Sequence, residues 1–285
     1  MLSSAKSFLF FERCEMEKII SQNGVVYFKS DKIKSKHAFA TRLGGISTLE
    51  HTSSLNLAFG RGDEDDTVIE NLRRLGDAVG FDPRSVISMP QIHSNRVIYA
   101  TSDMRGEGYF LPPSCECDGY VTDSVGVSIG VRTADCVPVL LEDSEAGVVA
   151  ALHAGWRGTF SDICGEGVRK MIAKGAEASR IVAVIGPSIC QNCYEVGNDV
   201  FDVSMLCMGD SARSFFAPRA QEGKYFVDIK GANKYLLERA GLKSENIEIL
   251  DLCTYEHPEI FWSHRYTHGR RGTMLSVICL GSSQI

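Results

Sequence analysis

The sequence lacks several features that would place it in a well-marked class of proteins. No run of about eighteen or more apolar residues occurs, which argues against a transmembrane helix. The apolar stretch Phe8 to Phe11 is too short for the h-region of a signal peptide, and no small-residue cleavage site accompanies it. Basic residues are not in excess either, because the formal net charge is -6. These absences predict a cytoplasmic protein that binds neither membranes nor nucleic acids.

Familiar cofactor motifs are also missing. Neither G-x-G-x-x-G nor G-x-x-x-x-G-K-[ST] occurs, so ATP and dinucleotide binding lose their usual sequence support. The chain has seven histidines and no His-x-His pair. A multicopper oxidase needs about ten histidines for its blue site and trinuclear cluster. The ligand count therefore excludes a multicopper laccase.

The cysteines do not indicate a disulfide scaffold. Ten cysteines in 285 residues are sparse for a disulfide-stabilised protein, so most are expected to be free thiols. Cys190 and Cys193 have Cys-x-x-Cys spacing, and Cys115 and Cys117 lie closer still. The second pair has the wrong gap for a zinc ribbon. A thioredoxin-like redox role for Cys190 and Cys193 stays open, although no basic residue beside them in the sequence would lower a thiol pKa.

The pattern of apolar residues predicts one mixed domain. No internal repeat, low-complexity tract or long linker divides the chain, and residues 1–37 are expected to pack as an N-terminal segment on a catalytic domain of residues 38–285. Buried strands are predicted at 125–131, 137–141, 148–152, 181–185 and 274–280. Helices are predicted at 67–79, 158–174, 199–208 and 229–240, the last with Asp228 as its N-cap. We expect an α/β (mixed α+β) fold, a single-domain sandwich with a central mixed β-sheet flanked by helices.

Three residues are candidate metal ligands: His93, Cys136 and His153. Two imidazoles and a thiolate suit a borderline-soft ion such as Zn²⁺, and three protein ligands leave one coordination position open, as in catalytic sites. No short-spaced signature joins them, and residues of these types are individually more often structural. However, Cys136 links two predicted strands and His153 ends another, and strand ends are where α/β sheets bind ligands.

These residues lie within short motifs that follow one another along almost the whole chain: 41–47 (TRLGGIS), 91–94 (QIHS), 117–119 (CDG), 133–138 (TADCVP), 153–159 (HAGWRGT), 185–187 (IGP), 194–197 (YEVG) and 263–265 (SHR). In these motifs the sequence resembles the YfiH-like family, first described as polyphenol oxidases or laccase-domain proteins and later as zinc-containing purine nucleoside enzymes. The resemblance implies that His93, Cys136 and His153 hold zinc, with copper as an alternative ion at the same site.

The resemblance also implies an activity. The family's reactions are phosphorolysis of adenosine, inosine, guanosine and methylthioadenosine, alongside deamination of adenosine. Purine nucleosides and inorganic phosphate are therefore the expected partners of a monomer or small homo-oligomer. Cys136, His153, Glu195 and Arg265 are the predicted catalytic residues, and Glu195 is the first candidate proton carrier, before Asp135, His264 and His268.

Phosphorolysis requires a site for a phosphate dianion. A guanidinium presents a planar fork to paired oxygens, so arginines in glycine-rich loops are the natural candidates. Arg42 and Arg157 lie in such loops, and His264 precedes Arg265. We predict that Arg42, Arg157 and His264 bind substrate or phosphate.

Three other functions stay open. The first is a copper-associated polyphenol oxidase that uses copper at the same site. The second is a metal-free hydrolase in which Cys136 is the nucleophile and His153 or His93 its base. The third is a structural zinc site, although such sites usually have four protein ligands.

Overall fold

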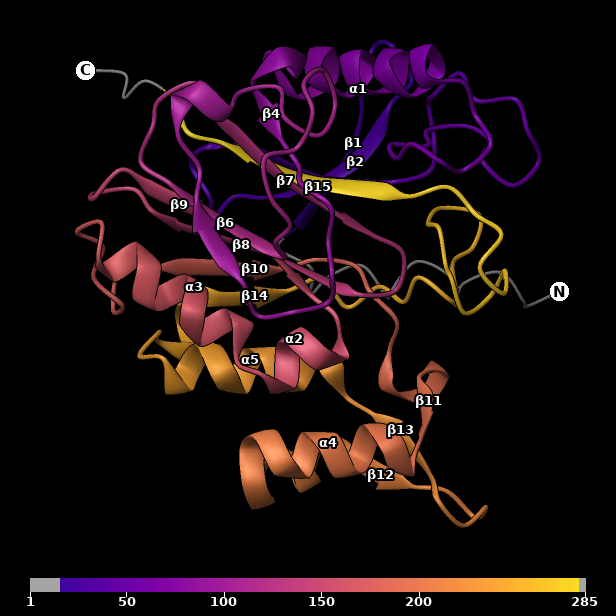
Figure 1. The fold of residues 1–285 in the computed structure, drawn as a ribbon, viewed down its shortest axis with the longest axis vertical. Helices are drawn as coiled ribbons and strands as arrows, with labels where there is room; N and C mark the ends of the chain where they lie inside the picture. Colours follow the sequence, from indigo (N-terminus) through magenta and orange to yellow (C-terminus); the bar gives the residue numbers. More distant parts are fainter. Residues whose placement is uncertain (1–15, 282–285) are drawn as a thin grey trace, which may run out of the picture.

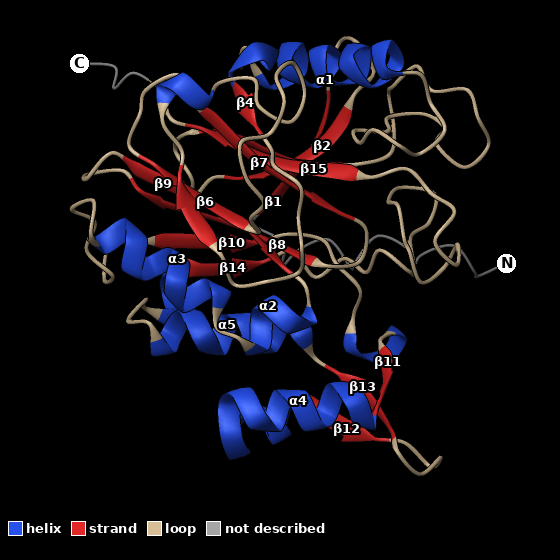
Figure 2. Ribbon diagram, in the orientation of Figure 1, coloured by secondary structure: helices blue, strands red, loops and turns tan. Residues whose placement is uncertain are grey.

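Four layers make up the fold, with two β-sheets facing each other and helices on their outer faces (Figures 1 and 2). The computed structural model describes residues 16–281, so the Phe8 to Phe11 stretch lies outside the described residues. The mixed α/β class predicted from the sequence is confirmed. The β part consists of two large stacked sheets and one small sheet, where one central sheet was expected.

The first large sheet, sheet A, is antiparallel except at one edge, where β4 pairs parallel to β7. Its strands in spatial order are β1 (Met16–Ile20), β2 (Val26–Ser30), β3 (Lys36–Ala40), β15 (Met274–Cys279), β7 (Ser128–Thr133) and β4 (Val86–Ile87). The first two strands lie within the predicted N-terminal segment, and the predicted boundary between residues 37 and 38 falls inside β3. The predicted division into segments stays a prediction.

The second large sheet, sheet B, carries the strands that the sequence predicts most clearly. Its strands in spatial order are β14 (Ile247–Ile249), β10 (Val182–Ile185), β8 (Val137–Asp143), β9 (Val148–Ala154), β6 (Gly119–Thr122) and β5 (Val97–Tyr99). All residues of β8 and β9 are buried. One face of sheet B packs against sheet A and the other against helices, and strands covered on both faces appear in sequence as continuous apolar runs.

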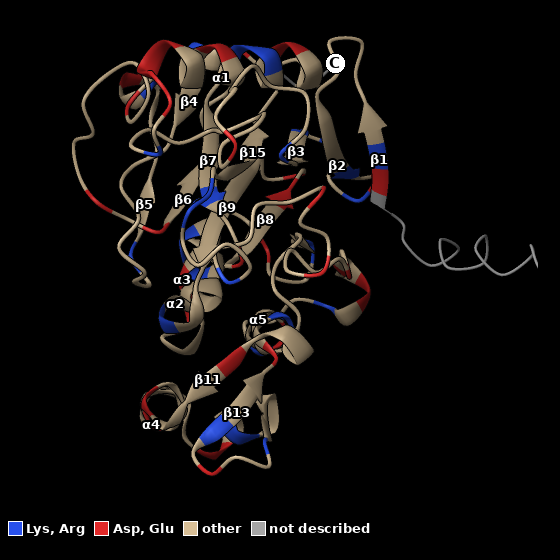
Figure 3. Ribbon diagram, turned by 90° about the vertical axis from the view of Figure 1, so that its right-hand side faces the viewer, with Lys and Arg blue, Asp and Glu red and all other residues tan. Residues whose placement is uncertain are grey.

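Helices cover the outer faces of both sheets. The helix α1 (Asp65–Val79) packs Val68, Leu72 and Leu75 on sheet A, and the helices α3 (Ile163–Ile172) and α5 (Ile229–Arg239) pack on sheet B. The spacing of these α1 residues is that of one helix face, which is why the pattern predicted this helix. The outer side of α1 carries both acidic and basic residues (Figure 3). No helix among the described residues has the length and apolar character needed to cross a membrane.

A small lobe extends below α5 in Figure 1. It consists of the helix α4 (Asn198–Met208) and a three-stranded sheet with the order β11 (Glu195–Gly197), β13 (Lys224–Val227) and β12 (Phe216–Pro218). Its core combines aromatic and aliphatic side chains, and Phe216 stacks on Phe160 of the helix α2 (Trp156–Phe160) at 5.5 Å between ring centroids. The described residues also include the 3₁₀ helices η1 (Pro83–Ser85), η2 (Ser102–Met104), η3 (Gln191–Cys193), η4 (Gly209–Phe215) and η5 (Ser244–Asn246).

Two element boundaries differ from the sequence prediction for local backbone reasons. The helix predicted over 158–174 is two helices, α2 and α3, because Asp162 adopts a left-handed conformation (φ 65°) and caps α3 by accepting a hydrogen bond from the Gly165 N–H. The strand predicted from residue 125 begins at Ser128 because Gly126, at φ 75°, forms a turn. The N-cap predicted at Asp228 is confirmed, since its carboxylate accepts from the Gly231 N–H.

A buried histidine in β3 should make stability depend on pH. The His37 Nδ1–H donates to Ser35 O at 2.8 Å and its Nε2 accepts from the Ser30 N–H at 2.9 Å, so the ring is neutral. Burial lowers the pKa of His37. The unfolded chain therefore takes up a proton near pH 6.5 that the folded protein does not, and the free energy of unfolding falls as the pH drops below this value.

The test is urea unfolding at pH 7 and pH 5 of the wild type and of His37→Gln, in which the side chain no longer titrates. The wild type should lose more unfolding free energy than the variant, by up to about 1.4 kcal/mol per pH unit. His257→Gln, in which a partly exposed ring is replaced, should behave like the wild type. Equal losses in the wild type and His37→Gln would show that His37 does not cause this pH dependence.

Candidate active site

A pocket of about 600 Å³ lies where the predicted ligands meet. It receives side chains from the ends of β7 and β9, the start of α2 and the loops around them. Its lining includes ionisable side chains from several segments: His93, Cys136, His153, Arg157, His264, Arg265 and Arg271. The pocket therefore combines the candidate metal ligands with several cationic side chains.

Strand register brings Cys136 and His153 together. In the antiparallel pair β8–β9, Pro138 lies opposite His153, so Cys136, just before β8, reaches the end of β9. The ligand atoms of Cys136, His153 and His93 all lie within 4.8 Å of one another. The two imidazole rings meet edge to face with their centroids 4.9 Å apart. His153 is buried and His93 exposed, so the group is open on one side.

Asp118, which is fully buried just before β6, holds both histidines. One carboxylate oxygen accepts from His153 Nδ1–H at 2.8 Å and from the His93 N–H at 2.9 Å. The other accepts from the N–H and the hydroxyl of Ser94, both at 2.7 Å. Burial raises the pKa of Asp118, but the hydrogen bonds from His153 and Ser94 outweigh it and leave the pKa below its usual value. Because Asp118 occupies Nδ1, the His153 Nε2 is left to face the other two ligands.

Asp118 lies in the Cys-Asp-Gly motif, but the sequence alone does not predict a role for it. The pairing of β6 with β9 is the feature that indicates a role for Asp118. Gly119 lies opposite Leu152 in this pair, so residue 118 lies beside residue 153. That pairing joins segments far apart in the chain.

The thiol of Cys136 ionises more readily than an ordinary cysteine thiol. Burial raises the pKa of this thiol, but the neighbouring His153 and His93 together lower it to about 6. Desolvation lowers the pKa of His153, whereas Cys136 and Asp118 raise it to about 9. The thiolate is the form that binds metal and also the form that acts as a nucleophile. The arrangement therefore fits both a metal centre and the cysteine hydrolase.

Asp135 connects the Cys136 loop to the opposite wall of the pocket. Its backbone has a φ of 90°, and its two carboxylate oxygens accept from the Thr254 hydroxyl and from the Arg265 N–H, each at 2.6 Å. One oxygen thus holds the loop of His264 and Arg265 against the metal-ligand loop, and the other holds the segment of Thr254.

The cationic wall includes predicted and unpredicted residues. Arg265 lines the pocket, donates to Glu195 O at 2.9 Å and lies 5.3 Å from the Tyr194 ring. Arg157 lies over Trp156 at 4.2 Å. His264 also lines the pocket, and burial, followed by the charges of Arg271 and Arg61, lowers its pKa.

Arg271 is a pocket residue that the sequence analysis missed. Its Nη1 donates to Gly272 O and to the Thr273 hydroxyl, both neutral groups, and its buried Nε has no hydrogen-bond partner. Burial and the nearby Arg61 lower the pKa of Arg271 to about 10. A partly buried guanidinium with neutral partners is suited to receive an anion. The pair Arg270-Arg271 shortly after the Ser-His-Arg motif was the available sequence signal.

Two predicted site residues are not brought to the pocket. The guanidinium of Arg42 donates to Pro258 O and Ser53 O and stacks on Trp262 at 3.8 Å. The carboxylate of Glu195 pairs with Arg219 and lies 4.0 Å from Lys224 Nζ, and Figure 3 shows acidic β11 beside basic β13. Neither residue lines the pocket. Their predicted roles stay predictions, and their side chains have other contacts.

Comparisons with known proteins cover nearly the whole chain. The model of a family described as multi-copper polyphenol oxidoreductase laccase matches residues 36–281. A purine nucleoside phosphorylase of Deinococcus radiodurans is 36% identical over 258 residues, which are 90% of this chain and 94% of that protein. Adenosine deaminase RL5, from an unknown prokaryotic organism, is 34% identical over 82% of this chain and 90% of its own length. The crystal structure of the hypothetical protein YfiH from Bacillus licheniformis aligns with a TM-score of 0.84 and 30% identity, covering 92% of this chain and 97% of that one.

Proposed function

We propose that this chain, which belongs to the family described as multi-copper polyphenol oxidoreductase laccase and is an enzyme, is a zinc-dependent purine nucleoside phosphorylase with adenosine deaminase activity. The relatives' names support the two reactions. The observation that carries the proposal is the joining of a His/Cys/His group and a cationic wall in one pocket.

The residues present fit zinc. Two imidazoles and a thiolate within 4.8 Å of one another, with Asp118 orienting His153, form the donor set and the supporting hydrogen bond of a catalytic zinc site. A blue copper centre also uses two histidines and a cysteine, with a weak axial methionine, glutamine or backbone oxygen, so copper is the alternative ion at this site. Zinc bound by His93, Cys136 and His153 would supply a Lewis acid with one open position.

The cationic wall fits inorganic phosphate. Phosphate attacks the anomeric carbon of the sugar as the bond to the purine nitrogen breaks, and the purine leaves with the bonding electrons and takes up a proton. Arg265 and Arg271 line the pocket and would hold the phosphate through charge-assisted hydrogen bonds. Arg157 lies at the exposed side of the same pocket.

The pocket also has room and chemistry for a nucleoside. Its volume of about 600 Å³ falls in the range of small-molecule sites. Trp156, Tyr194 and Phe59 line it and offer apolar faces to a purine base. The lowered pKa of His264 keeps this imidazole neutral at pH 7, so it can exchange a proton with the purine or with the ammonia released in deamination. We propose adenosine, inosine, guanosine and methylthioadenosine as substrates.

The test of this proposal is a product analysis of adenosine incubated with the zinc-loaded protein, with and without inorganic phosphate. We expect adenine and ribose 1-phosphate only when phosphate is present, and inosine in both conditions. If neither product set forms although zinc is bound, the substrate is not a purine nucleoside and the proposal fails.

Asp118 should determine the affinity of the metal site. Asp118→Ala removes the acceptor that orients His153 and the His93 backbone, and loss of such a supporting carboxylate lowers metal affinity by about 10–100-fold. The measurement is zinc affinity by competition with a chelator. Asp118→Asn, which keeps one acceptor oxygen, should lie between the wild type and alanine, and Asp123→Ala, at an exposed carboxylate paired with Lys174, should not change the affinity. Wild-type affinity in Asp118→Ala would remove Asp118 from this role.

The metal-free hydrolase is the second candidate, because Cys136 and His153 already form a polarised pair. Chelation separates the two functions. A hydrolase that uses the Cys136 thiolate keeps its activity when all metal is removed, whereas the proposed zinc enzyme loses it.

A further inference from the structure

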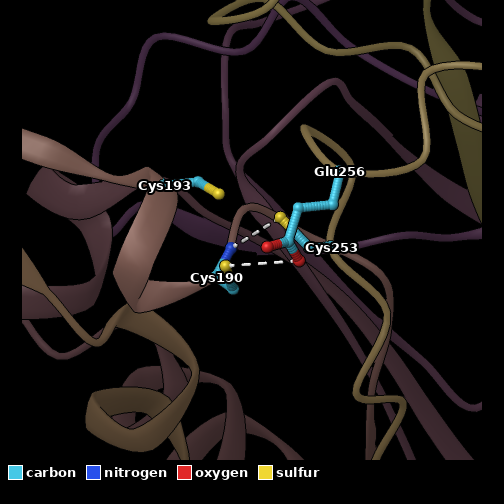
Figure 4. A group of neighbouring side chains, drawn as sticks. All are labelled: Cys190, Cys193, Cys253 and Glu256. Atoms are coloured by element: carbon cyan, nitrogen blue, oxygen red, sulfur yellow. Dashed lines mark hydrogen bonds between the residues drawn. The ribbon is translucent and has the colours of Figure 1, made fainter.

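Four side chains converge at a second place, outside the pocket. Cys190, Cys193, Cys253 and Glu256 each direct one sulfur or oxygen atom to a common point, and these atoms all lie within 4.8 Å of one another (Figure 4). Cys190 is the N-cap of the 3₁₀ helix η3 and Cys193 is its last residue, and the other two residues follow β14 by a few positions. A β-bridge between Ser188 and Cys253 joins the two segments.

The donor set is that of a structural metal site. We propose that these four residues bind a second zinc ion, which shares no ligand with the centre at Cys136. Three thiolates and a carboxylate complete a tetrahedral shell without an open position, which is the ligand count of structural zinc. The Cys-x-x-Cys spacing of the first two ligands is also typical of such sites.

The contacts of the four side chains bring the donor atoms together. The Cys190 N–H donates to Cys253 Sγ at 3.3 Å, and the Cys190 thiol donates to Glu256 Oε2 at 3.8 Å. Burial raises the pKa of the Cys190 and Cys193 thiols, so a metal ion must displace their protons. Cys253 is buried, whereas Glu256 is exposed, so an ion can reach the site from the Glu256 side. When zinc binds, the three thiols release their protons to solvent.

A buried lysine compensates for the charge. Three thiolates, one carboxylate and Zn²⁺ carry a net charge of -2. Lys230 of α5 is buried, donates to Leu250 O and Leu252 O, and pairs with Asp251 at 3.6 Å. Burial lowers the pKa of Lys230, and the neighbouring Asp251, Cys253 and Cys190 oppose this shift. Its ammonium group would offset part of the negative charge of the proposed site.

The proposed zinc would stabilise the wall of the pocket. Ile189 and Tyr194, which line the pocket, immediately flank the Cys190 to Cys193 segment. On the other segment Thr254, next to Cys253, donates its hydroxyl to Asp135 beside Cys136. One ion at this place would therefore tie together two loops that shape the pocket but belong to distant parts of the chain.

The test uses cobalt in place of zinc, because thiolate ligands give cobalt a charge-transfer absorption. The reduced, metal-free Cys136→Ala protein lacks the thiolate of the pocket centre. We expect it to bind one equivalent of cobalt with a strong charge-transfer band. Cys136→Ala/Cys193→Ala should lose most of the band, whereas Cys136→Ala/Cys207→Ala, in which an exposed cysteine outside the cluster is replaced, should keep it.

Wild-type protein should correspondingly retain two equivalents of zinc, and His93→Ala, at an exposed ligand of the pocket centre, should retain at least one. The proposal is overturned if reduced, folded Cys136→Ala shows no charge-transfer band. It is equally overturned if the band is unchanged in Cys136→Ala/Cys193→Ala. A disulfide between Cys190 and Cys193 that must be reduced before alkylation, with no cobalt bound afterwards, would assign the cluster to redox chemistry instead. None of these outcomes depends on nucleoside activity.

Discussion

Cys136→Ala is expected to lower kcat/KM for adenosine phosphorolysis by about 10³-fold and to reduce the zinc content by one equivalent. A Lewis acid contributes several kcal/mol of transition-state stabilisation, and each 1.4 kcal/mol corresponds to a factor of about ten. Cys136 supplies the only thiolate of its group, and its pKa of about 6 makes it anionic at pH 7. Zinc analysis and steady-state kinetics measure the two effects.

Folding is the necessary control for this result. Cys136 lies in the link before β8 and is only partly buried, so the change to alanine should leave thermal unfolding close to that of the demetallated wild type. Cys207→Ala should alter neither zinc content nor activity. Unchanged zinc content in Cys136→Ala would remove this residue from the ligand set.

Arg265→Ala is expected to raise the KM for phosphate by about 10–100-fold, because a hydrogen bond to a charged group contributes about 1.5–3 kcal/mol. Zinc content and the rate of inosine formation should change little, since deamination uses no phosphate. This split between the two reactions distinguishes a phosphate ligand from a residue that only stabilises the fold. The measurement is the phosphate dependence of adenine release and of inosine formation in the same preparation.

Two other arginine variants serve as controls for Arg265→Ala. Arg265→Lys keeps the positive charge but loses the planar, two-pronged guanidinium. Its KM for phosphate should therefore lie between those of the wild type and the alanine variant. Arg42→Lys should affect stability and leave the phosphate KM unchanged, because Arg42 is held by Pro258, Ser53 and Trp262. An Arg265→Ala protein in which phosphorolysis and deamination fall equally would assign Arg265 to structure.

The parts of the fold that the sequence predicts are those determined by local patterns. The strands β8 and β9 are continuous apolar runs because both faces are covered, and α1 shows the spacing of a helix with one buried face. Asp228 caps α5 through a bond to its own third neighbour. Each of these signals lies within one short segment.

The parts that the sequence does not predict depend on contacts between distant segments. The two-sheet arrangement requires β15, near the end of the described chain, to insert between β3 and β7. The left-handed Asp162 that divides the predicted helix is likewise a conformation that the apolar spacing does not encode.

The same distinction applies to the candidate site. Motif resemblance indicated His93, Cys136 and His153, and the structure brings them together. Asp118 acts through the β6–β9 pairing, and Arg271 reaches the pocket from a loop near the C-terminal strand. A motif also does not show whether a side chain points into the pocket. Arg265 donates a hydrogen bond to the Glu195 carbonyl, but only Arg265 lines the pocket.

The most direct test is the rate of ribose 1-phosphate formation from adenosine and phosphate by the demetallated protein, before and after zinc is restored. We predict that the metal-free protein is inactive, that zinc restores activity, and that copper does not. Full activity in the metal-free protein, or none after zinc has rebound, would contradict a zinc-dependent purine nucleoside phosphorylase.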